Sequence, residues 1–385
     1  MMKVQDLLKF IPKEELEFLA AETKVNHQVK KLDGITMFQL LLYSMLNHNH
    51  ASLRVMEKFY HSSSFKILAG TGEQTTKFNS IRDRMVTMNP EFFEKIFYSL
   101  FDKFSKYFNE KNAIQRYDTT MEAVSSKLVD WGMKVGRETN KKQIKYTIGL
   151  KGSFPCHVEI FKHKEALCED NTIPHAIFNS KEKDQGIIVF DRGVQKRKTF
   201  VKLTKDNLRF VTRIKTDVSY KIISSESIID PEPNSTVDIQ ADLIVQLMNK
   251  ERDKTDPTFR LIKAQINASG EPIYFLTNIM DMNAYEIAAL YKQRWQIEVF
   301  FKFLKQQLNL SHLVSRNTNA IRVNLYMTLI ASILIIAYRK LNNITGYKIA
   351  KLQMANDLEE SLISQIVILC GGNPQLFFKK EPDVP

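Results

Sequence analysis

The stretch from residue 284 to 309, AYEIAALYKQRWQIEVFFKFLKQQLN, constrains this chain more than any other segment. At roughly 100° per residue its apolar spacing predicts one long helix. One face of that helix carries Tyr291, Arg294, Glu298, Lys302 and Lys305. The face beside it carries Leu290, Ile297, Phe301, Leu304 and Leu308. Much of the remaining circumference carries Trp295, Val299, Phe300 and Phe303. We therefore expect the helix to be buried on most sides.

The position of Glu298 on this helix points to a charged ligand. A carboxylate with cations around it on a largely apolar helix is costly to bury unless it binds something charged. The plain alternative is an i, i+4 pair of Arg294 and Glu298 on a solvated face. The apolar surroundings disfavour that alternative, so a charged ligand is the better interpretation.

The spacing Tyr291-x2-Arg294-x3-Glu298-x6-Lys305 resembles the Y-R-E-K signature of bacterial insertion-sequence transposases of the DDE type. The similarity extends to the whole local sequence YKQRWQIEVFFKFLKQ, and it covers residues 110 to 345 well. The resemblance implies a ribonuclease H-like catalytic core in which three carboxylates hold divalent metal ions. It also implies two further carboxylates upstream, each at the end of a strand.

Two upstream aspartates fit that expectation. AIQRYD, residues 113 to 118, reads as a strand that ends at Asp118 and runs into a turn. IIVFDRG, residues 187 to 193, reads as a buried strand broken at Asp191. Taken alone, each aspartate is an ordinary turn residue. Their order before the Glu298 helix is that of the family, so the resemblance implies Asp118, Asp191 and Glu298 as catalytic residues and metal ligands.

The chemistry implied by this resemblance is phosphoryl transfer with two ions per site, Mg²⁺ in the first place and Mn²⁺ as a substitute. Mg²⁺ prefers oxygen ligands and keeps positions open for water and phosphate. Two such ions stabilise both the attacking and the leaving oxygen. By the same resemblance, Arg294 and Lys305 hold DNA phosphates and Tyr291 supports the same strand, with Lys302 on the same face.

The net charge of +12 is concentrated in two segments. Residues 134–151 and 192–221 together carry +13, so the rest of the chain is close to neutral. Both segments lie near a candidate aspartate, which favours a polyanion groove over two solvated faces. The expected phosphate contacts of the second segment are Arg192, Lys196, Arg197, Lys198 and Lys202. The aromatic residues that we expect to add stacking surfaces are Tyr146, Phe200, Phe210 and Tyr220.

Other classes of protein are disfavoured. The three cysteines show no paired spacing, which fits a reducing compartment. The chain lacks a glycine-rich phosphate loop with its strand and lysine, so we expect no nucleotide cofactor. Residues 323–338 are apolar but short for a membrane span, and we interpret them as a core helix, with no membrane partner. The expected location is the bacterial cytoplasm, in association with the nucleoid.

The predicted fold class is mixed α/β. Residues 1–110 form a helical region, since Phe38, Leu41, Leu42 and Met45 have helical spacing, and the resemblance implies that it binds DNA ends. Residues 111–204 and 271–345 form the ribonuclease H-like core. Residues 205–270 form a β-rich insertion, because LRFVTRI, VSYKIIS and FRLIKAQI are β-type runs between polar turns, and PIYFLTN returns the chain to the core. Residues 346–385 form a partly helical tail.

The function implied is cut-and-paste DNA transposition. Such an enzyme cleaves double-stranded DNA at the terminal inverted repeats of the element and joins the freed ends to target DNA. The expected assembly on DNA is a homodimer. Two alternatives stay open, a metal-dependent DNA nuclease without strand transfer and a domesticated DNA-binding protein that no longer cuts. A basic RNA-binding protein is disfavoured, because no RNA-binding module is recognisable. A hairpin intermediate has no assigned base-flipping residue, since Trp131 and Trp295 lie outside the insertion.

Overall fold

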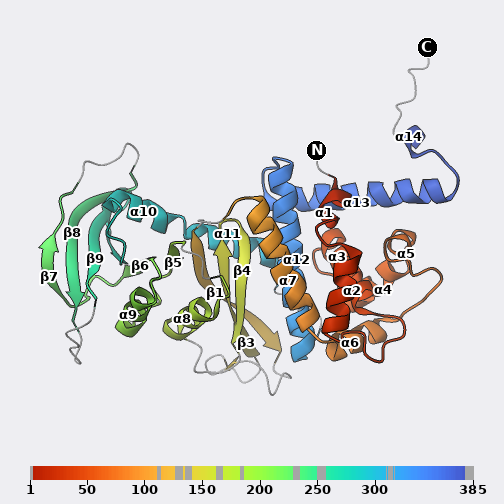
Figure 1. Ribbon diagram of the computed structural model, residues 1–385, viewed down its shortest axis with the longest axis horizontal. Helices are drawn as coiled ribbons and strands as arrows, with labels where there is room; N and C mark the ends of the chain where they lie inside the picture. The colour runs from red at the N-terminus through yellow and green to blue at the C-terminus, as the bar shows by residue number, and fades with distance from the viewer. Residues whose placement is uncertain are drawn as a thin grey trace, which may run out of the picture. The chain divides into compact units, whose positions relative to one another are not determined.

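The computed structural model describes residues 3–110, 114–125, 133–134, 141–161, 168–182, 186–228, 235–248, 257–308, 310, 315 and 317–377. The chain divides into two compact units. A helical unit is formed by Met1–Phe104 with Lys302–Pro385, and an α/β unit is formed by Ser105–Phe301. Figure 1 labels most elements of the two units, which are described separately below.

In the helical unit, side-chain caps set the starts of three consecutive helices. The helices are α1 (Val4–Leu8), α2 (Lys13–Glu22), α3 (Gly34–Asn47), α4 (Leu53–Tyr60), α5 (Ser63–Ala69), α6 (Phe78–Thr87), α7 (Glu91–Tyr107), α12 (Thr318–Leu341), α13 (Tyr347–Leu369) and α14 (Pro374–Phe377). Asp33, Ser52 and Ser62 each accept a hydrogen bond from a backbone amide in the first turn of the helix that follows. The helical character predicted for the amino-terminal region is confirmed.

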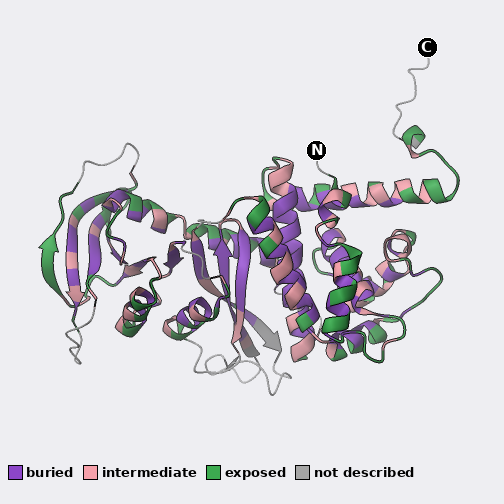
Figure 2. Cartoon of the chain, in the orientation of Figure 1, coloured by how far each residue is buried: buried purple, intermediate pink, exposed green. Residues whose placement is uncertain are grey.

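The long apolar helix α12 is the core of this unit. Its residues from Val323 to Tyr338 are all buried (Figure 2). It packs against α3, α6 and α13. By length and composition α12 could cross a membrane, but 94% of its most apolar window is buried inside the protein. Its burial is what the core-helix interpretation of residues 323–338 requires.

The α/β unit is built on one sheet. Its strands are β1 (Gln115–Ser125), β2 (Met133–Lys134), β3 (Lys141–Lys151), β4 (Phe154–Phe161), β5 (Ile188–Phe190), β6 (Phe210–Ile214), β7 (Tyr220–Ser225), β8 (Val237–Leu247), β9 (Phe259–Ile266) and β10 (Pro272–Thr277). Its helices are α8 (Glu169–Asn179), α9 (Arg197–Lys205), α10 (Ala284–Lys292) and the first part of α11 (Trp295–Gln307).

The order of strands identifies the core. β4, β3, β1, β5 and β6 are neighbours in that order. The pairs β1–β5 and β5–β6 are parallel, whereas β1–β3 and β3–β4 are antiparallel. This is the strand arrangement of ribonuclease H-like folds, so the predicted fold class is confirmed. β6, at the start of the interval assigned to the insertion, pairs in parallel with β5.

The remaining strands continue the same sheet. β10 pairs antiparallel with β6, and β9, β8 and β7 follow in order. β8 has no counterpart in the sequence analysis. Its alternating start, VDIQ, is a strand signal, but a bulge between Ile239 and Ala241 shifts the register and breaks the alternation.

Helices cover both faces of the sheet. On one face, Ile173 of α8 and Phe200 of α9 pack with Phe190 and Phe210. On the other face, α10 packs over the sheet, and its residue Ile287 belongs to the same cluster as Val189 and Phe275. Figure 1 shows α8 and α9 on the side of the sheet opposite α10. Because both faces are covered, the central strands are apolar on both sides, as the run IIVF predicted.

A buried ion pair ties the outer strands to α10. Arg260 on β9 donates to both carboxylate oxygens of Asp242 on β8, at 2.8 and 2.5 Å, and it also donates to the Met282 carbonyl just before α10. The side chains of Arg260 and Asp242 are only 7% and 1% exposed.

Removal of one partner from this pair tests the packing of the outer strands. Asp242→Ala leaves a buried guanidinium without its carboxylate, and the free energy of unfolding should fall by about 3–5 kcal/mol. Asp281→Ala breaks the exposed pair with Arg209 and should cost less than about 1 kcal/mol. Urea denaturation measures both, and equal effects would show that the Asp242–Arg260 pair does not hold these strands.

Candidate active site

The register of β1 and β5 brings Asp118 and Asp191 to adjacent positions. Tyr117 and Phe190 are the last paired residues of the two parallel strands. Asp118 and Asp191 each follow directly, so both lie at the same edge, roughly one strand spacing apart. Tyr117 and Phe190 point into the α8–α9 face. Because side chains alternate along a strand, the two aspartates are directed to the face that carries α10.

The local setting of Asp118 differs from the prediction. The strand does not end there, because β1 continues to Ser125 with antiparallel pairing to β3. Asp118 is therefore a residue inside a long strand, at the point where its second neighbour, β5, stops. The turn signal that we inferred from the threonines after Asp118 was wrong, since Thr119 and Thr120 belong to β1.

The predicted single helix is interrupted beside the aspartates. α10 ends at Lys292 and α11 begins at Trp295, so Gln293 and Arg294 lie between two helices. Buried Arg116 on β1 holds this break, since its Nε donates to the Gln293 carbonyl at 2.8 Å and its Nη2 donates to Gln293 Oε1 at 3.0 Å. Arg116 also donates to the Gly152 carbonyl at 3.0 Å. Its guanidinium therefore fixes Arg294 relative to β1.

Arg294 lies between two of the candidate carboxylates. Its Nη1 is 3.3 Å from Asp118 Oδ2, and its Nη2 is 2.5 Å from Glu298 Oε1. The exposed fractions of the three side chains are 15% for Arg294, 14% for Asp118 and 33% for Glu298. The i, i+4 pair of Arg294 and Glu298 thus exists, but it is part of a half-buried cluster and not a solvated surface pair.

Negative charge is crowded at Asp118. Burial raises the pKa of its carboxyl from 3.8 to about 6. The Thr119 amide, which donates to Asp118 Oδ1 at 2.7 Å, and the Arg294 guanidinium oppose this rise in pKa. The charges of Asp191 and Glu169 add to it. The carboxylates of Asp191 and Glu169 are therefore close enough to Asp118 to repel its negative charge.

Glu169 and Asp170, in the first turn of α8, were missed by sequence analysis. Glu169 Oε1 accepts from the Thr119 hydroxyl at 3.3 Å, and a Cβ added to Gly193 would lie 1.6 Å from Glu169 Oε2. Asp170 accepts from the backbone amides of Gln195 and Lys196. These two acids therefore support the loop that follows Asp191. Acids are common in the first turn of helices, so no sequence signal separates them from ordinary ones.

Tyr291 is buried on α10 beside this cluster. Its ring centroid lies 5.9 Å from the Arg294 guanidinium carbon and 5.5 Å from the Phe275 ring. Burial raises the pKa of its phenol to about 12. The hydroxyl therefore stays protonated at neutral pH and can donate a hydrogen bond to an anionic group.

The two lysines that follow Glu298 on the same helix are assigned to the other compact unit. Lys302 and Lys305 belong to the part of α11 that falls in the helical unit. Along α11, Ile297, Phe300 and Leu304 are buried as expected, but Trp295 is 62% exposed and Val299 is 42% exposed. The expectation that the helix is buried on most sides was therefore wrong for these two residues, since the side that carries them has no cover within the described chain.

The second basic segment lies directly after Asp191. Arg192 is exposed in the loop, and α9 carries Arg197, Lys198 and Lys202. Lys196 precedes α9, and its ammonium donates to Asn171 on α8. The Lys202 ammonium lies 3.9 Å from the centroid of the Phe178 ring on α8. Five cations thus follow one candidate carboxylate on one loop and one helix.

Other parts of the expected groove are buried. Lys145 and Lys151 of the first basic segment are both 2% exposed, and Lys151 pairs with Glu182 at 2.8 Å. Residues 135–140 lie outside the described residues. Tyr146, Phe200 and Phe210 are buried in the core, so the prediction that they offer stacking surfaces was wrong. Their apolar rings fill the space between the sheet and its helices instead.

The donors at this edge suit a hard divalent cation. Asp118, Asp191 and Glu298 offer only carboxylate oxygens, which Mg²⁺ and Mn²⁺ prefer. Burial raises the pKa of Asp118 and the charge of Asp191 adds to the rise, so a further cation at this edge would favour the ionised carboxylate. Among the described residues, no three His, Cys, Asp or Glu side chains are gathered as ligands around one point. The Arg294 guanidinium lies between Asp118 and Glu298 instead.

The family model and the three relatives described here that match this chain are all of transposases. The family model described as the transposase DDE domain matches residues 122–334, a span that begins just after Asp118 and includes Asp191 and Glu298. A putative transposase of Sinorhizobium fredii is 33% identical over 157 residues, which are 41% of this chain and 44% of that protein. The putative transposase for insertion sequence element IS4SA of Synechocystis is 25% identical over 79% of this chain and 81% of its own length. The probable transposase for insertion sequence element IS5377 of Geobacillus stearothermophilus is 24% identical over 57% of this chain and 54% of its own length.

A solved piggyBac transposase synaptic complex with hairpin DNA matches at 12% identity and a TM-score of 0.45, over 100% of this chain and 87% of that chain. This similarity is below the level that would show a shared fold.

The raised pKa of Asp118 predicts a pH-dependent cost of stability. A carboxyl whose pKa is higher in the folded protein than in the unfolded chain costs stability when ionised, and the cost disappears as the pH falls through the folded value. In chelator, Asp118→Asn should therefore be more stable relative to wild type at pH 8 than at pH 5, by at most about 3 kcal/mol. Thermal denaturation at the two pH values measures the difference. A stability difference that does not change with pH would contradict the raised pKa.

Proposed function

The chain belongs to the family of transposases with a DDE domain, and we propose that it is the transposase of a bacterial insertion sequence. The proposal is that it cleaves double-stranded DNA at the terminal inverted repeats of the element and joins the freed ends to target DNA, as a homodimer on the DNA. Its proposed place is the cytoplasm, in association with the nucleoid. The observation that carries the activity is the register that puts Asp118 beside Asp191 with Arg294 and Glu298 against them.

Asp118, Asp191 and Glu298 would hold two Mg²⁺ or Mn²⁺ ions. Such ions supply activation of the attacking oxygen and stabilisation of the leaving oxygen in an in-line displacement. In the first reaction the oxygen of water forms a bond to phosphorus at the element's end, and the 3′-oxygen leaves as a hydroxyl. In the second reaction that 3′-hydroxyl forms a bond to a target phosphorus, and the 3′-oxygen of the target leaves.

Arg294 has two proposed roles in this site. Without DNA its guanidinium shares the oxygens of Asp118 and Glu298 that an ion would use. A phosphate is a bidentate partner for arginine, so a bound DNA end offers the guanidinium a second anion. Arg294 would then release carboxylate oxygens and stabilise charge that develops at the scissile phosphate. Buried Tyr291, which stays protonated, would donate a hydrogen bond to the DNA strand that carries this phosphate.

Lys305, together with Lys302 and the cations after Asp191, would add contacts to the DNA backbone. Arg192, Lys196, Arg197, Lys198 and Lys202 follow the site on a loop and a helix that α8 supports. Their role would be neutralisation of phosphates without base recognition.

Charge-neutral replacement of the carboxylates tests the catalytic assignment. Glu298→Gln and Asp191→Asn should lower Mg²⁺-dependent cleavage of an end-containing duplex by roughly a thousandfold or more, because each removes a ligand charge. Binding of the same duplex should change little, since the phosphate contacts are intact. Glu271→Gln, an exposed site in the same unit, is the matched control and should cut as wild type does.

Cleavage by either variant at the wild-type rate would overturn the assignment. A strand-transfer assay with the same duplex and a supercoiled target then separates a transposase from a nuclease. Cleaved ends that never join to the target would leave the metal site in place and remove the transposase proposal.

A further inference from the structure

The strand β6 places one more charged residue at the edge that carries the candidate carboxylates. Phe190 of β5 and Thr212 of β6 are the last paired residues of these two parallel strands. Asp191 and Arg213 follow directly, so they lie roughly one strand spacing apart. Val211 packs with α10, and side chains alternate along a strand, so Arg213 is directed to the same face as Asp191. A third strand thus brings an arginine to this edge.

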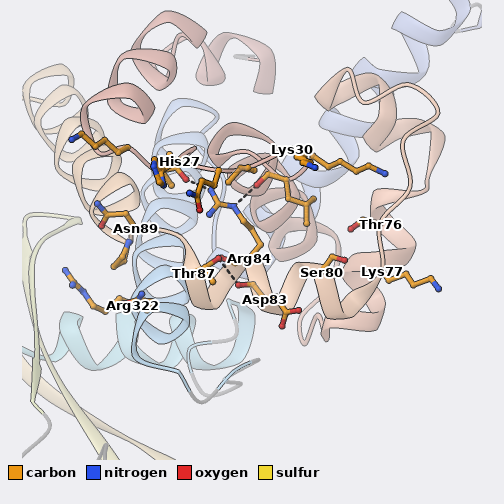
Figure 3. Close-up of a pocket in the computed structure, with 18 of the residues that line it drawn as sticks. His27, Lys30, Thr76, Lys77, Ser80, Asp83, Arg84, Thr87, Asn89 and Arg322 are labelled. Atoms are coloured by element: carbon orange, nitrogen blue, oxygen red, sulfur yellow. Dashed lines mark hydrogen bonds between the residues drawn. The ribbon is translucent and has the colours of Figure 1, made fainter.

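Three buried arginines of this chain have partners within the protein. In the helical unit, Arg84 donates to two backbone carbonyls of the loop between α2 and α3, at 2.7 and 2.5 Å, beside the pocket drawn in Figure 3. In the α/β unit, Arg116 donates to backbone carbonyls, and Arg260 donates to Asp242. Each of these guanidiniums therefore serves the fold.

The guanidinium of Arg213 has no such partner. Its Nε is shielded from solvent and makes no hydrogen bond. Across the described residues, no carboxylate forms an ion pair with Arg213, and no acceptor takes a hydrogen bond from its guanidinium. Arg294, by contrast, is shared by Asp118 and Glu298. A buried donor without a partner costs free energy, so Arg213 is available to an anionic ligand that would satisfy it.

The hydroxyl of Tyr291 is a second such donor beside Arg213. Tyr291 is 8% exposed, and its hydroxyl makes no hydrogen bond of normal geometry with the described residues. Its ring lies 5.5 Å from that of Phe275, which pairs with Arg213 in the register of β10 and β6. Burial raises the pKa of this phenol most, the charge of Arg294 lowers it, the charge of Asp191 raises it, and that of Arg213 lowers it. The hydroxyl therefore lies within range of both Arg213 and Asp191.

Resting on the proposed function, we propose that Arg213, with the Tyr291 hydroxyl, binds a DNA phosphate that neighbours the cleaved one on the same strand. The order β1, β5, β6 places Asp191 between Asp118 and Arg213, so the arginine lies beyond the two aspartates along the edge. The reacting phosphate belongs at the ions that Asp118 and Asp191 would hold, and the next phosphate of the strand then reaches Arg213. A guanidinium binds phosphate through two nitrogens, which would give the buried Nε its missing partner. The contact holds the strand in register with the site and takes no part in the displacement.

The test replaces single phosphates of an end-containing duplex by neutral methylphosphonates, one position at a time on both sides of the cleaved bond. Fluorescence anisotropy in chelator, at one salt concentration, measures the affinity of wild type, Arg213→Ala and the control Arg209→Ala for each duplex. Arg209 lies just before β6 and pairs with Asp281 at 2.6 Å on the surface.

For wild type and the control, neutralisation of one phosphate beside the cleaved bond should weaken binding roughly tenfold. For Arg213→Ala, that phosphate should no longer matter, whereas the other phosphates keep their effect. Tyr291→Phe should lose part of the sensitivity at the same position.

A profile of Arg213→Ala that matches wild type at every position would overturn the assignment and leave the proposed function in place, since wild type still binds and cuts. Loss of sensitivity at the cleaved phosphate, and not at a neighbour, would contradict the proposed position of the contact. Wild type that neither binds nor cuts the duplex would remove the proposed function and this inference with it.

Arg213→Met, which keeps an unbranched stem, separates a role in binding from a role in the fold and replaces the alanine variant if that variant does not fold. Its midpoint of urea denaturation should equal or exceed that of wild type, because the buried Nε has no hydrogen bond to lose. A lower midpoint, with an unchanged methylphosphonate profile, would show that the guanidinium serves the fold and not the DNA.

Discussion

The pair of aspartates placed where the parallel pairing of β1 and β5 ends is the constraint on which the rest of the α/β unit depends. Parallel pairing ends at Tyr117 and Phe190, so the next residue of each strand is an aspartate at the same edge. Burial and the neighbouring carboxylates raise the pKa of Asp118 to about 6. Such an arrangement costs stability unless cations offset it, and Arg294 offsets part of it. The remaining negative charge is what a divalent ion would neutralise.

Much of the surrounding structure positions that one arginine. Arg116 on β1 binds the Gln293 backbone and side chain, which holds the break between α10 and α11. A capping box formed by Asn283 and Glu286 fixes the start of α10. On the other face of the sheet, α8 supports the loop after Asp191 through Asp170. The site thus depends on three features: the register of β1 and β5, the break between α10 and α11, and the first turn of α8. These features position the candidate ligands but do not supply a ligand themselves.

The sequence predicts the elements that follow a simple periodicity and those that resemble the family's motifs. The apolar runs of β1 and β5 and the helical spacing of α3 predicted real elements, because burial dictates those patterns. It placed the Asp191 loop and the Glu298 helix, yet it missed the break at Gln293, since that break depends on Arg116, a residue distant in sequence. Glu169 was missed because only folding brings it to Thr119.

The central claim is that Arg294 and a divalent ion share the oxygens of Asp118 and Glu298. Isothermal titration of DNA-free protein with Mn²⁺ tests it most directly, with wild type compared to Arg294→Ala and with Arg209→Ala, a surface arginine of the same unit, as control. The account predicts that Arg294→Ala binds Mn²⁺ several times more tightly than wild type, because the guanidinium no longer occupies the carboxylates, and that Arg209→Ala is unchanged. An affinity of Arg294→Ala equal to or weaker than that of wild type would contradict it.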